Sequence, residues 1–406
     1  MSVLERFLKY VKFDTASDPN SDLAPSTLKQ LELGKALVAE LKELEVSDAY
    51  LSDTGYVYAT LPANLEGVTP IGFIAHLDTS YEVSGKDVQA RVIENYDGQD
   101  INLNSEVITK VADFPFLSDL KGKTIVVTDG TTLLGADDKA GVAEIMTLVA
   151  YYQNNPQVSH GEIKICFTPD EEIGRGTVNF DFDYFKVDFA YTLDGGAVGG
   201  IEYENFNAAS AVVNVKGVSI HPGSAKNKMI NAINLAHEFH SLLPYQARPE
   251  YTSDYEGFIH LNDLNGGVEL VTLKYIIRDH DMVNFNNLKK AMQQAQKFIN
   301  EKYQADFVDL KIEDSYYNMK ESLKDKMGII ELAKTAIRNV GIVPYSLPIR
   351  GGTDGAMLTY QGLPCPNLGT GGYNYHSKHE FAVVEEMEQS VQIMQEIVRL
   401  VSVGKM

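Results

Sequence analysis

Hydrophobic and polar residues follow two patterns along the first half of the chain, one typical of amphipathic helices and one typical of buried strands. Apolar residues recur at three- and four-residue intervals in residues 4–13 and 27–45, and this spacing predicts amphipathic helices. Largely apolar runs predict buried strands, with a further helix over residues 138–155 between two of them. Strands that alternate with helices indicate an α/β domain with a β-sheet flanked by helices. The predicted strands are residues 57–63, 70–79, 124–130, 162–172 and 188–196.

The pattern changes between residues 207 and 315. Extended and helical segments there follow the order βαββαβ, and Leu264-Asn265-Gly266-Gly267 is a hairpin signal between the two middle strands. Long helical patterns return after this region. At 406 residues the chain is also longer than one core usually supports. We therefore expect a catalytic domain formed by residues 1–206 and 316–406, interrupted by an inserted α+β, ferredoxin-like domain over residues 207–315.

The net charge and the cysteine content limit the kinds of partner that the protein can bind. The formal net charge of -21 argues against nucleic acids and anionic membranes and favours cationic partners such as metal ions. Cys166 and Cys365 are the two cysteines, which is too few for a disulfide framework or a thiolate zinc site. The first residues read as an amphipathic helix and not as a signal peptide, so we expect a cytoplasmic protein.

Histidine and acidic residues gather where the predicted strands end. His76 and Asp78 end one strand, the acidic triplet 170–172 ends another, and Asp194 a third, while Asp137 and Asp138 precede the helix at 138–155. Ligand sites in open α/β sheets lie beyond the carboxyl ends of the strands, so these side chains are expected to meet. Each motif alone has an ordinary explanation as a turn or a helix start. Together they require a counter-charge, and a divalent metal supplies it.

The choice of metal depends on the imidazoles. Two histidines with several carboxylates suit zinc or a similar ion better than calcium or magnesium. The second histidine is expected from the glycine-rich segment 371–381, which offers His376 and His379. His221, in the inserted domain, is either an exposed loop histidine or part of the site.

Several of these motifs occur together in one known family. The motifs are "HLDT", "GADDKAG", "TPDEEIG", "TLDGG", "HPGSAKN", "RGGTDGA" and "GGYNYHSKHEF". In order and spacing they resemble the metallopeptidase family that includes aminoacylases and zinc carboxypeptidases. The likeness covers essentially the whole chain, and it implies two zinc ions per subunit, with cobalt or manganese as substitutes.

The resemblance also implies a role for each site residue. Glu171 would be the general base and Asp78 the catalytic carboxylate that orients the first ligand histidine. Asp137 would bridge the two ions, with Asp138 in support. The remaining ligands would be His76 and Asp194 for the first ion and Glu172 and His379, not His376, for the second.

The same resemblance implies an activity. It indicates a metallo-aminopeptidase that removes the N-terminal residue from tripeptides by attack of a water shared by the two metals. A related N-acyl-amino-acid amidohydrolase or dipeptidase is the alternative, because it would use the same site. His221, Arg278 and Arg350 would contact the peptide substrate, although each arginine could instead form a structural ion pair with a neighbouring aspartate. The inserted domain would also be the surface for a homodimer.

Overall fold

The computed structural model describes residues 1–405, and the chain divides into two compact units. The first unit comprises residues 1–203, 322–347 and 353–406, and the second comprises residues 204–321 and 348–352. Helix α6 (Met319–Leu323) crosses the division between them. The structure thus has the mixed α/β and inserted α+β architecture predicted from the sequence. No helix in the described part of the chain combines the length and apolar character that a membrane span requires.

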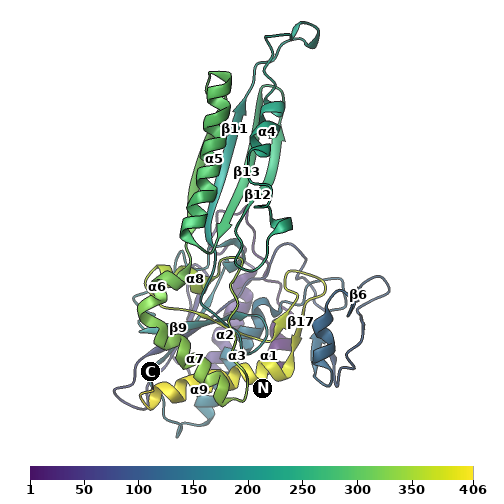
Figure 1. Cartoon of the computed structure of the whole chain (residues 1–406). Helices are drawn as coiled ribbons and strands as arrows, with labels where there is room; N and C mark the ends of the chain where they lie inside the picture. Colours follow the sequence, from purple (N-terminus) through teal and green to yellow (C-terminus); the bar gives the residue numbers. More distant parts are fainter. Residues whose placement is uncertain (406) are drawn as a thin grey trace. The chain divides into compact units, whose positions relative to one another are not determined.

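The centre of the first unit is a seven-stranded mixed sheet (Figure 1). Its strand order is β1-β2-β8-β3-β9-β15-β10, and the four strands β8, β3, β9 and β15 run parallel to one another. All six residues of β3 are buried, as expected for a strand covered on both faces. The strands are β1 (Tyr50–Leu51), β2 (Val57–Leu61), β8 (Ile163–Thr168), β3 (Ile71–His76), β9 (Phe189–Gly195), β15 (Asn367–Gly369) and β10 (Ile201–Glu202).

Helices cover both faces of this sheet. Leu193 of β9 lies against Gly141 of α3, whereas Ala190 of the same strand packs in a cluster with Leu358 of α8. Successive strand residues point to opposite faces, so α3 and α8 lie on opposite sides of the sheet. Helix α3 also packs against α1 and α9. The helices are α1 (Val3–Tyr10), α2 (Gln30–Glu43), α3 (Ala136–Asn154), α7 (Met327–Asn339), α8 (Asp354–Tyr360) and α9 (Val384–Ser402).

One predicted strand belongs to a separate small sheet. The run at residues 124–130 forms β7 (Ile125–Val127), which pairs with β4 (Arg91–Ile93) and β17 (Phe381–Val383), and not with the main sheet. Strand β16 (Gly372–Tyr373) completes this antiparallel sheet, in the order β16-β17-β7-β4. A hairpin of β5 (Ile101–Asn102) and β6 (Ile108–Thr109) contributes Ile101 to the same apolar cluster. This sheet anchors both ends of the glycine-rich segment.

The second unit has the predicted order βαββαβ. Its four strands form an antiparallel sheet in the order β12-β13-β11-β14, and α4 and α5 pack against it. Alternate residues of β13, from Val271 to Ile277, are buried in the cluster shared with these helices. The hairpin turn lies at residues 267–269, a little later than predicted, since β12 continues to Gly266. The elements are β11 (Asn207–Lys216), α4 (Ala232–Ser241), β12 (Phe258–Gly266), β13 (Leu270–Asp279), α5 (Met282–Tyr303) and β14 (Val308–Tyr316).

Gly141 allows α3 to approach the main sheet closely. A Cβ atom at this position would lie 2.1 Å from the carbonyl oxygen of Leu193. Alanine normally stabilises a helix over glycine by about 1 kcal/mol. At Gly141 the clash with a backbone atom outweighs this gain, and we expect Gly141→Ala to lower the free energy of unfolding by about 3 kcal/mol.

Thermal unfolding of the metal-free protein measures this effect. The control is Gly328→Ala in α7, where an added Cβ would have no described heavy atom within 4 Å. The control is expected to unfold at the wild-type temperature or slightly above it. A Gly141→Ala variant as stable as the Gly328→Ala variant would contradict the close approach of α3 to β9.

Candidate metal centre

The predicted site residues of the main sheet meet at one edge. His76 is the last residue of β3, Glu171 and Glu172 follow β8, and Asp194 lies one residue before the end of β9. Strands β8, β3 and β9 are parallel neighbours, so their carboxyl ends open on the same side. Topology therefore brings together residues that are as much as 118 positions apart in sequence (194 minus 76).

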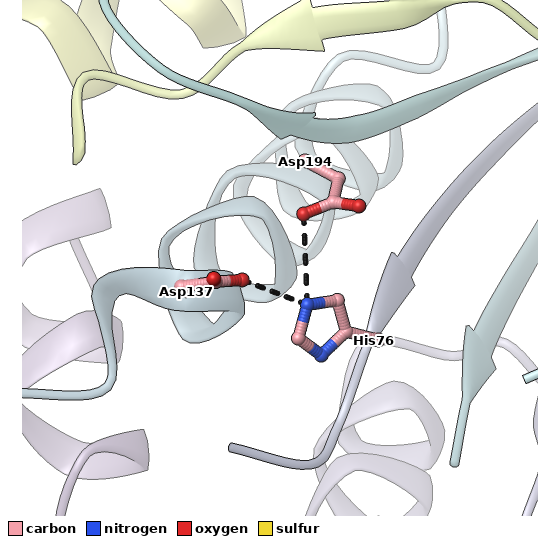
Figure 2. A group of neighbouring side chains, drawn as sticks. All are labelled: His76, Asp137 and Asp194. Atoms are coloured by element: carbon pink, nitrogen blue, oxygen red, sulfur yellow. Dashed lines mark hydrogen bonds and ion pairs between the residues drawn. The ribbon is translucent and has the colours of Figure 1, made fainter. Parts of the chain in front are cut away.

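The first group of candidate ligands consists of His76, Asp137 and Asp194. The Nε2 atom of His76 lies 2.8 Å from Oδ1 of Asp137 and 3.5 Å from Oδ1 of Asp194, as Figure 2 shows. His76 is 2 % exposed, and both carboxylates are largely shielded. One ligand atom from each residue lies within 4.8 Å of the others, which is compact enough to surround one ion.

The ring of His76 is oriented from its other side by Asp78. Its Nδ1 atom lies 2.9 Å from the backbone oxygen and 3.5 Å from the carboxylate Oδ1 of Asp78. With the Nδ1 proton donated to Asp78, Nε2 faces Asp137 and Asp194 and could offer its lone pair to an ion held between them. A ligand histidine is commonly fixed in this way by an acceptor at its second nitrogen.

Asp78 also holds the loop after β8. Its two carboxylate oxygens accept the backbone N–H groups of Glu171 and Glu172 at 3.0 and 3.2 Å. Asp78 is fully buried, so these bonds are shielded from water. Asp78 thus positions the imidazole of β3 mainly through its backbone oxygen and the acidic residues that follow β8 through its carboxylate.

The second group of candidate ligands consists of Asp137, Glu172 and His376. Nε2 of His376 lies 2.8 Å from Oε2 of Glu172 and 3.2 Å from Oδ2 of Asp137. Asp137 belongs to both groups, one carboxylate oxygen facing each histidine. This is the arrangement expected of a carboxylate shared by two ions.

The histidine of this group differs from the one expected. The prediction favoured His379, but its Nδ1 atom lies 2.9 Å from Oγ1 of Thr109 and its ring packs against Phe114. The backbone of Asn374 and His376 has positive φ, and this turn directs His376 towards Asp137. The structure therefore brings His376, and not the expected His379, to Asp137 and Glu172, and the assignment of the ligand histidine is taken up as a proposal below. Both lie in one irregular loop, where no periodicity assigns a direction to a side chain.

The three acids of the triplet have separate surroundings. Asp170 is buried and accepts hydrogen bonds from the backbone N–H of Ser26 and from Nε2 of Gln30, both at 2.7 Å. Its φ of 59° ends the strand, and Glu171–Ile173 forms a short 3-10 helix. Asp170 therefore fixes the loop, while Glu171 and Glu172 are left for the site.

The electrostatics show that the cluster requires positive charge. Burial raises the pKa of Glu172 to about 7, with a further contribution from the charge of Asp137. Burial and the charge of Asp194 raise the pKa of Glu171 well above its usual value. The pKa of His376 is raised to about 11 by its hydrogen bonds to Asp137 and Glu172. In the absence of another cation, the imidazoles themselves must neutralise the carboxylates.

The donor set fits divalent metal ions. Oε1 of Glu172 is buried and has no hydrogen-bond partner among the described residues, an unusual state for a carboxylate oxygen. A cation beside Asp137 and Glu172 would satisfy this oxygen and relieve the repulsion between the acids. Mixed imidazole and carboxylate ligands are typical of zinc, cobalt or manganese sites.

Sequence reasoning assigned no role to Glu380. Its buried carboxylate accepts the backbone N–H groups of Leu134, Gly135 and Asp137 at 2.7, 2.8 and 3.0 Å. The only signal in the sequence was its place beside His379 in the glycine-rich segment.

The predicted substrate-binding residues lie in the second unit. His221 is exposed, and its Nδ1 accepts the backbone N–H of Gly223 at 3.1 Å. The guanidinium of Arg278 donates to the backbone oxygens of Ala209 and Ile277 and lies over the ring of Tyr316.

Arg350 is held in a similar way. It donates to the backbone oxygens of Asp254 and Glu256 and to Oγ1 of Thr252, and it lies over the ring of Phe206. The contacts described for both arginines are therefore to backbone oxygens, a hydroxyl and aromatic rings. Their role towards a substrate stays a prediction.

The two imidazoles and three carboxylates at this edge of the sheet form a candidate centre for two metal ions. The model of peptidase family M20/M25/M40 matches residues 124–400, and the chain belongs to this family. It is 53% identical over 401 residues to a protein named Peptidase T from Clostridium acetobutylicum, and 54% identical over 402 residues to one from Desulfitobacterium hafniense. Each alignment covers 98% of both chains.

Solved structures share the fold. The aminopeptidase PepT of Bacillus cereus ATCC 10987 has a TM-score of 0.78 at 23% identity, covering 98% of each chain. A tripeptidase of Staphylococcus aureus has the same TM-score at 22% identity, also over 98% of each chain. The YXEP protein of Bacillus subtilis, described as a dinuclear metal binding peptidase from the M20 family, has a TM-score of 0.64 at 14% identity, covering 99% of this chain and 97% of its own.

Proposed function

We propose that this protein is a dinuclear metal-dependent aminopeptidase that removes the N-terminal residue from tripeptides. The observation that carries the proposal is Asp137, whose two carboxylate oxygens face two different histidines within two overlapping ligand groups. Identity of 53% over nearly the full length with proteins named Peptidase T supports the same activity. The names of two solved structures with this fold, an aminopeptidase and a tripeptidase, agree with it.

Two ions would be held by the two groups. His76 and Asp194 would hold one, Glu172 and His376 the other, and Asp137 would lie between them. When bound, such ions lower the pKa of a water molecule and polarise a carbonyl group. We propose zinc as the physiological metal, with cobalt or manganese as substitutes, because the imidazoles favour these ions over calcium or magnesium.

Glu171 is proposed as the general base. Its backbone N–H is held by Asp78, and its half-buried side chain feels the charges of Asp194 and Glu172. The pKa of Glu171 is raised first by burial and then by the charge of Asp194, and a raised pKa suits a group that must both accept and release a proton near neutral pH. It would take the proton of the attacking water and deliver it to the amine that leaves.

Asp78 is proposed to orient other residues of the site. It fixes the tautomer of His76 and the backbone of Glu171 and Glu172 at the same time. His221, Arg278 and Arg350 are proposed to contact the peptide, the arginines through its terminal carboxylate. A homodimer formed through the inserted domain and a location in the cytoplasm likewise remain predictions.

A substrate panel on metal-stripped protein tests the proposed function. Tripeptides, dipeptides, tetrapeptides and N-acyl amino acids are each offered before and after zinc, cobalt or manganese is restored. We expect chelation to remove activity, restored metal to return it, and tripeptides to be cleaved with the highest kcat/KM. Cleavage of acyl amino acids with tripeptides left intact would instead support the related amidohydrolase.

A further inference from the structure

Glu380 stands out among the buried acids because its bonds reach the backbone that carries Asp137. It is 1 % exposed, and its Oε2 accepts the N–H groups of Leu134 and Gly135, while Oε1 accepts that of Asp137. A carboxylate that accepts several backbone N–H groups in a buried place fixes those groups firmly. The bonds surround the turn at Gly135, whose φ is 82°.

The residue before α3 does not cap the helix with a side chain. This residue is Gly135, and Asp137 and Asp138 have non-helical backbone angles. The first turn of α3 therefore does not impose a regular helical geometry on Asp137. Glu380, from a segment 243 residues later, supplies the acceptors that such a turn requires.

Glu380 is itself firmly placed. The next residue, Phe381, begins β17 and pairs with Val127 of β7. Four residues earlier in the same segment lies His376, the histidine that faces Asp137 and Glu172. One anchored segment thus presents His376 directly and holds the backbone of Asp137 through Glu380.

We propose that Glu380 is a positioning residue of the metal centre, which sets Asp137 at the distance from His376 that a shared ion requires. This inference rests on the proposed dinuclear function. Its counterpart is Asp78, whose carboxylate accepts the backbone N–H groups of Glu171 and Glu172 in the same manner. Two buried carboxylates therefore fix the two sides of the ligand cluster without themselves belonging to either ligand group.

Metal affinity, measured without substrate, tests the proposal. Glu380→Ala and Glu380→Gln are compared with wild type by competition against a chromophoric chelator, using zinc alone as the probe. Residues that hydrogen-bond to metal ligands typically contribute 10–100-fold to metal affinity. We therefore expect the more weakly bound zinc ion to bind about 10–100-fold less tightly to Glu380→Ala than to wild type. The glutamine variant retains one acceptor oxygen and is expected to lie between alanine and wild type.

Glu144→Gln is the matched control. Glu144 is a fully buried carboxylate of α3 that accepts a hydrogen bond from Ser390 at 2.7 Å and belongs to neither ligand group. If Glu380 only stabilised the fold, both glutamine variants would lower the Tm of the metal-free protein and neither would change metal affinity. That result, or wild-type affinity in Glu380→Ala, would overturn the role of Glu380 alone. A wild-type protein that held fewer than two ions would overturn the proposed function and this inference together.

Discussion

Replacing Glu171 by glutamine is expected to lower kcat for tripeptides by about 10²–10⁴-fold, the range that a positioned acid–base group contributes. The amide has the size of the carboxylate but cannot take a proton from water. Glu171 belongs to neither ligand group, so the variant is expected to bind both ions as tightly as wild type. Steady-state kinetics with a tripeptide, together with metal content, measure the two effects separately.

The control for Glu171→Gln is again Glu144→Gln, which replaces a buried acidic side chain that belongs to neither ligand group. This control is expected to keep near-wild-type kcat. Normal turnover in Glu171→Gln would refute its assignment as the base. Loss of an ion in the variant would show instead that Glu171 is a ligand.

Exchanging each histidine of the glycine-rich segment for alanine is expected to give opposite results. His376→Ala removes an imidazole that lies 2.8 Å from Glu172 and 3.2 Å from Asp137, so affinity for the second ion should fall by roughly 100-fold or more, beyond the effect of an outer partner. His379→Ala removes a ring that contacts Thr109 and Phe114, and it should leave both ions bound.

These two variants form a matched pair, since they remove the same side chain from one loop at positions three residues apart. Zinc stoichiometry by chelator competition and activity on a tripeptide are read for both. Loss of an ion in His379→Ala with full occupancy in His376→Ala would restore the original expectation and contradict the geometry of the loop.

Much of the fold followed from local patterns. The order βαββαβ of residues 207–315 appears in the structure because its four strands form one sheet and the apolar residues of α4 and α5 pack in one cluster with them. The strand at 124–130 was also visible as an apolar run, yet it pairs with β4 and β17 in a separate sheet. Hydrophobicity shows that a strand is buried but carries no information about the strand beside it.

The candidate site likewise has features that the sequence predicted and features that only the structure decided. The sequence by itself determined that His76, the acids at 170–172 and Asp194 end strands, and the parallel order of those strands was enough to make them meet. The family resemblance predicted separate roles for Glu171 and Glu172 in "TPDEEIG". The contacts of Asp170 with Ser26 and Gln30 show that the first acid of the triplet fixes the loop.

Only the tertiary structure decided which histidine joins Asp137 and Glu172, and which buried carboxylates support the cluster. His376 and His379 share one irregular loop, whose side-chain directions depend on turns at positive φ and on contacts with residues up to 270 positions away. Glu380 likewise acts through hydrogen bonds to a backbone 243 residues earlier. Helices and strands can be predicted from the spacing of their apolar residues. The conformation of a loop depends instead on distant segments that pack against it.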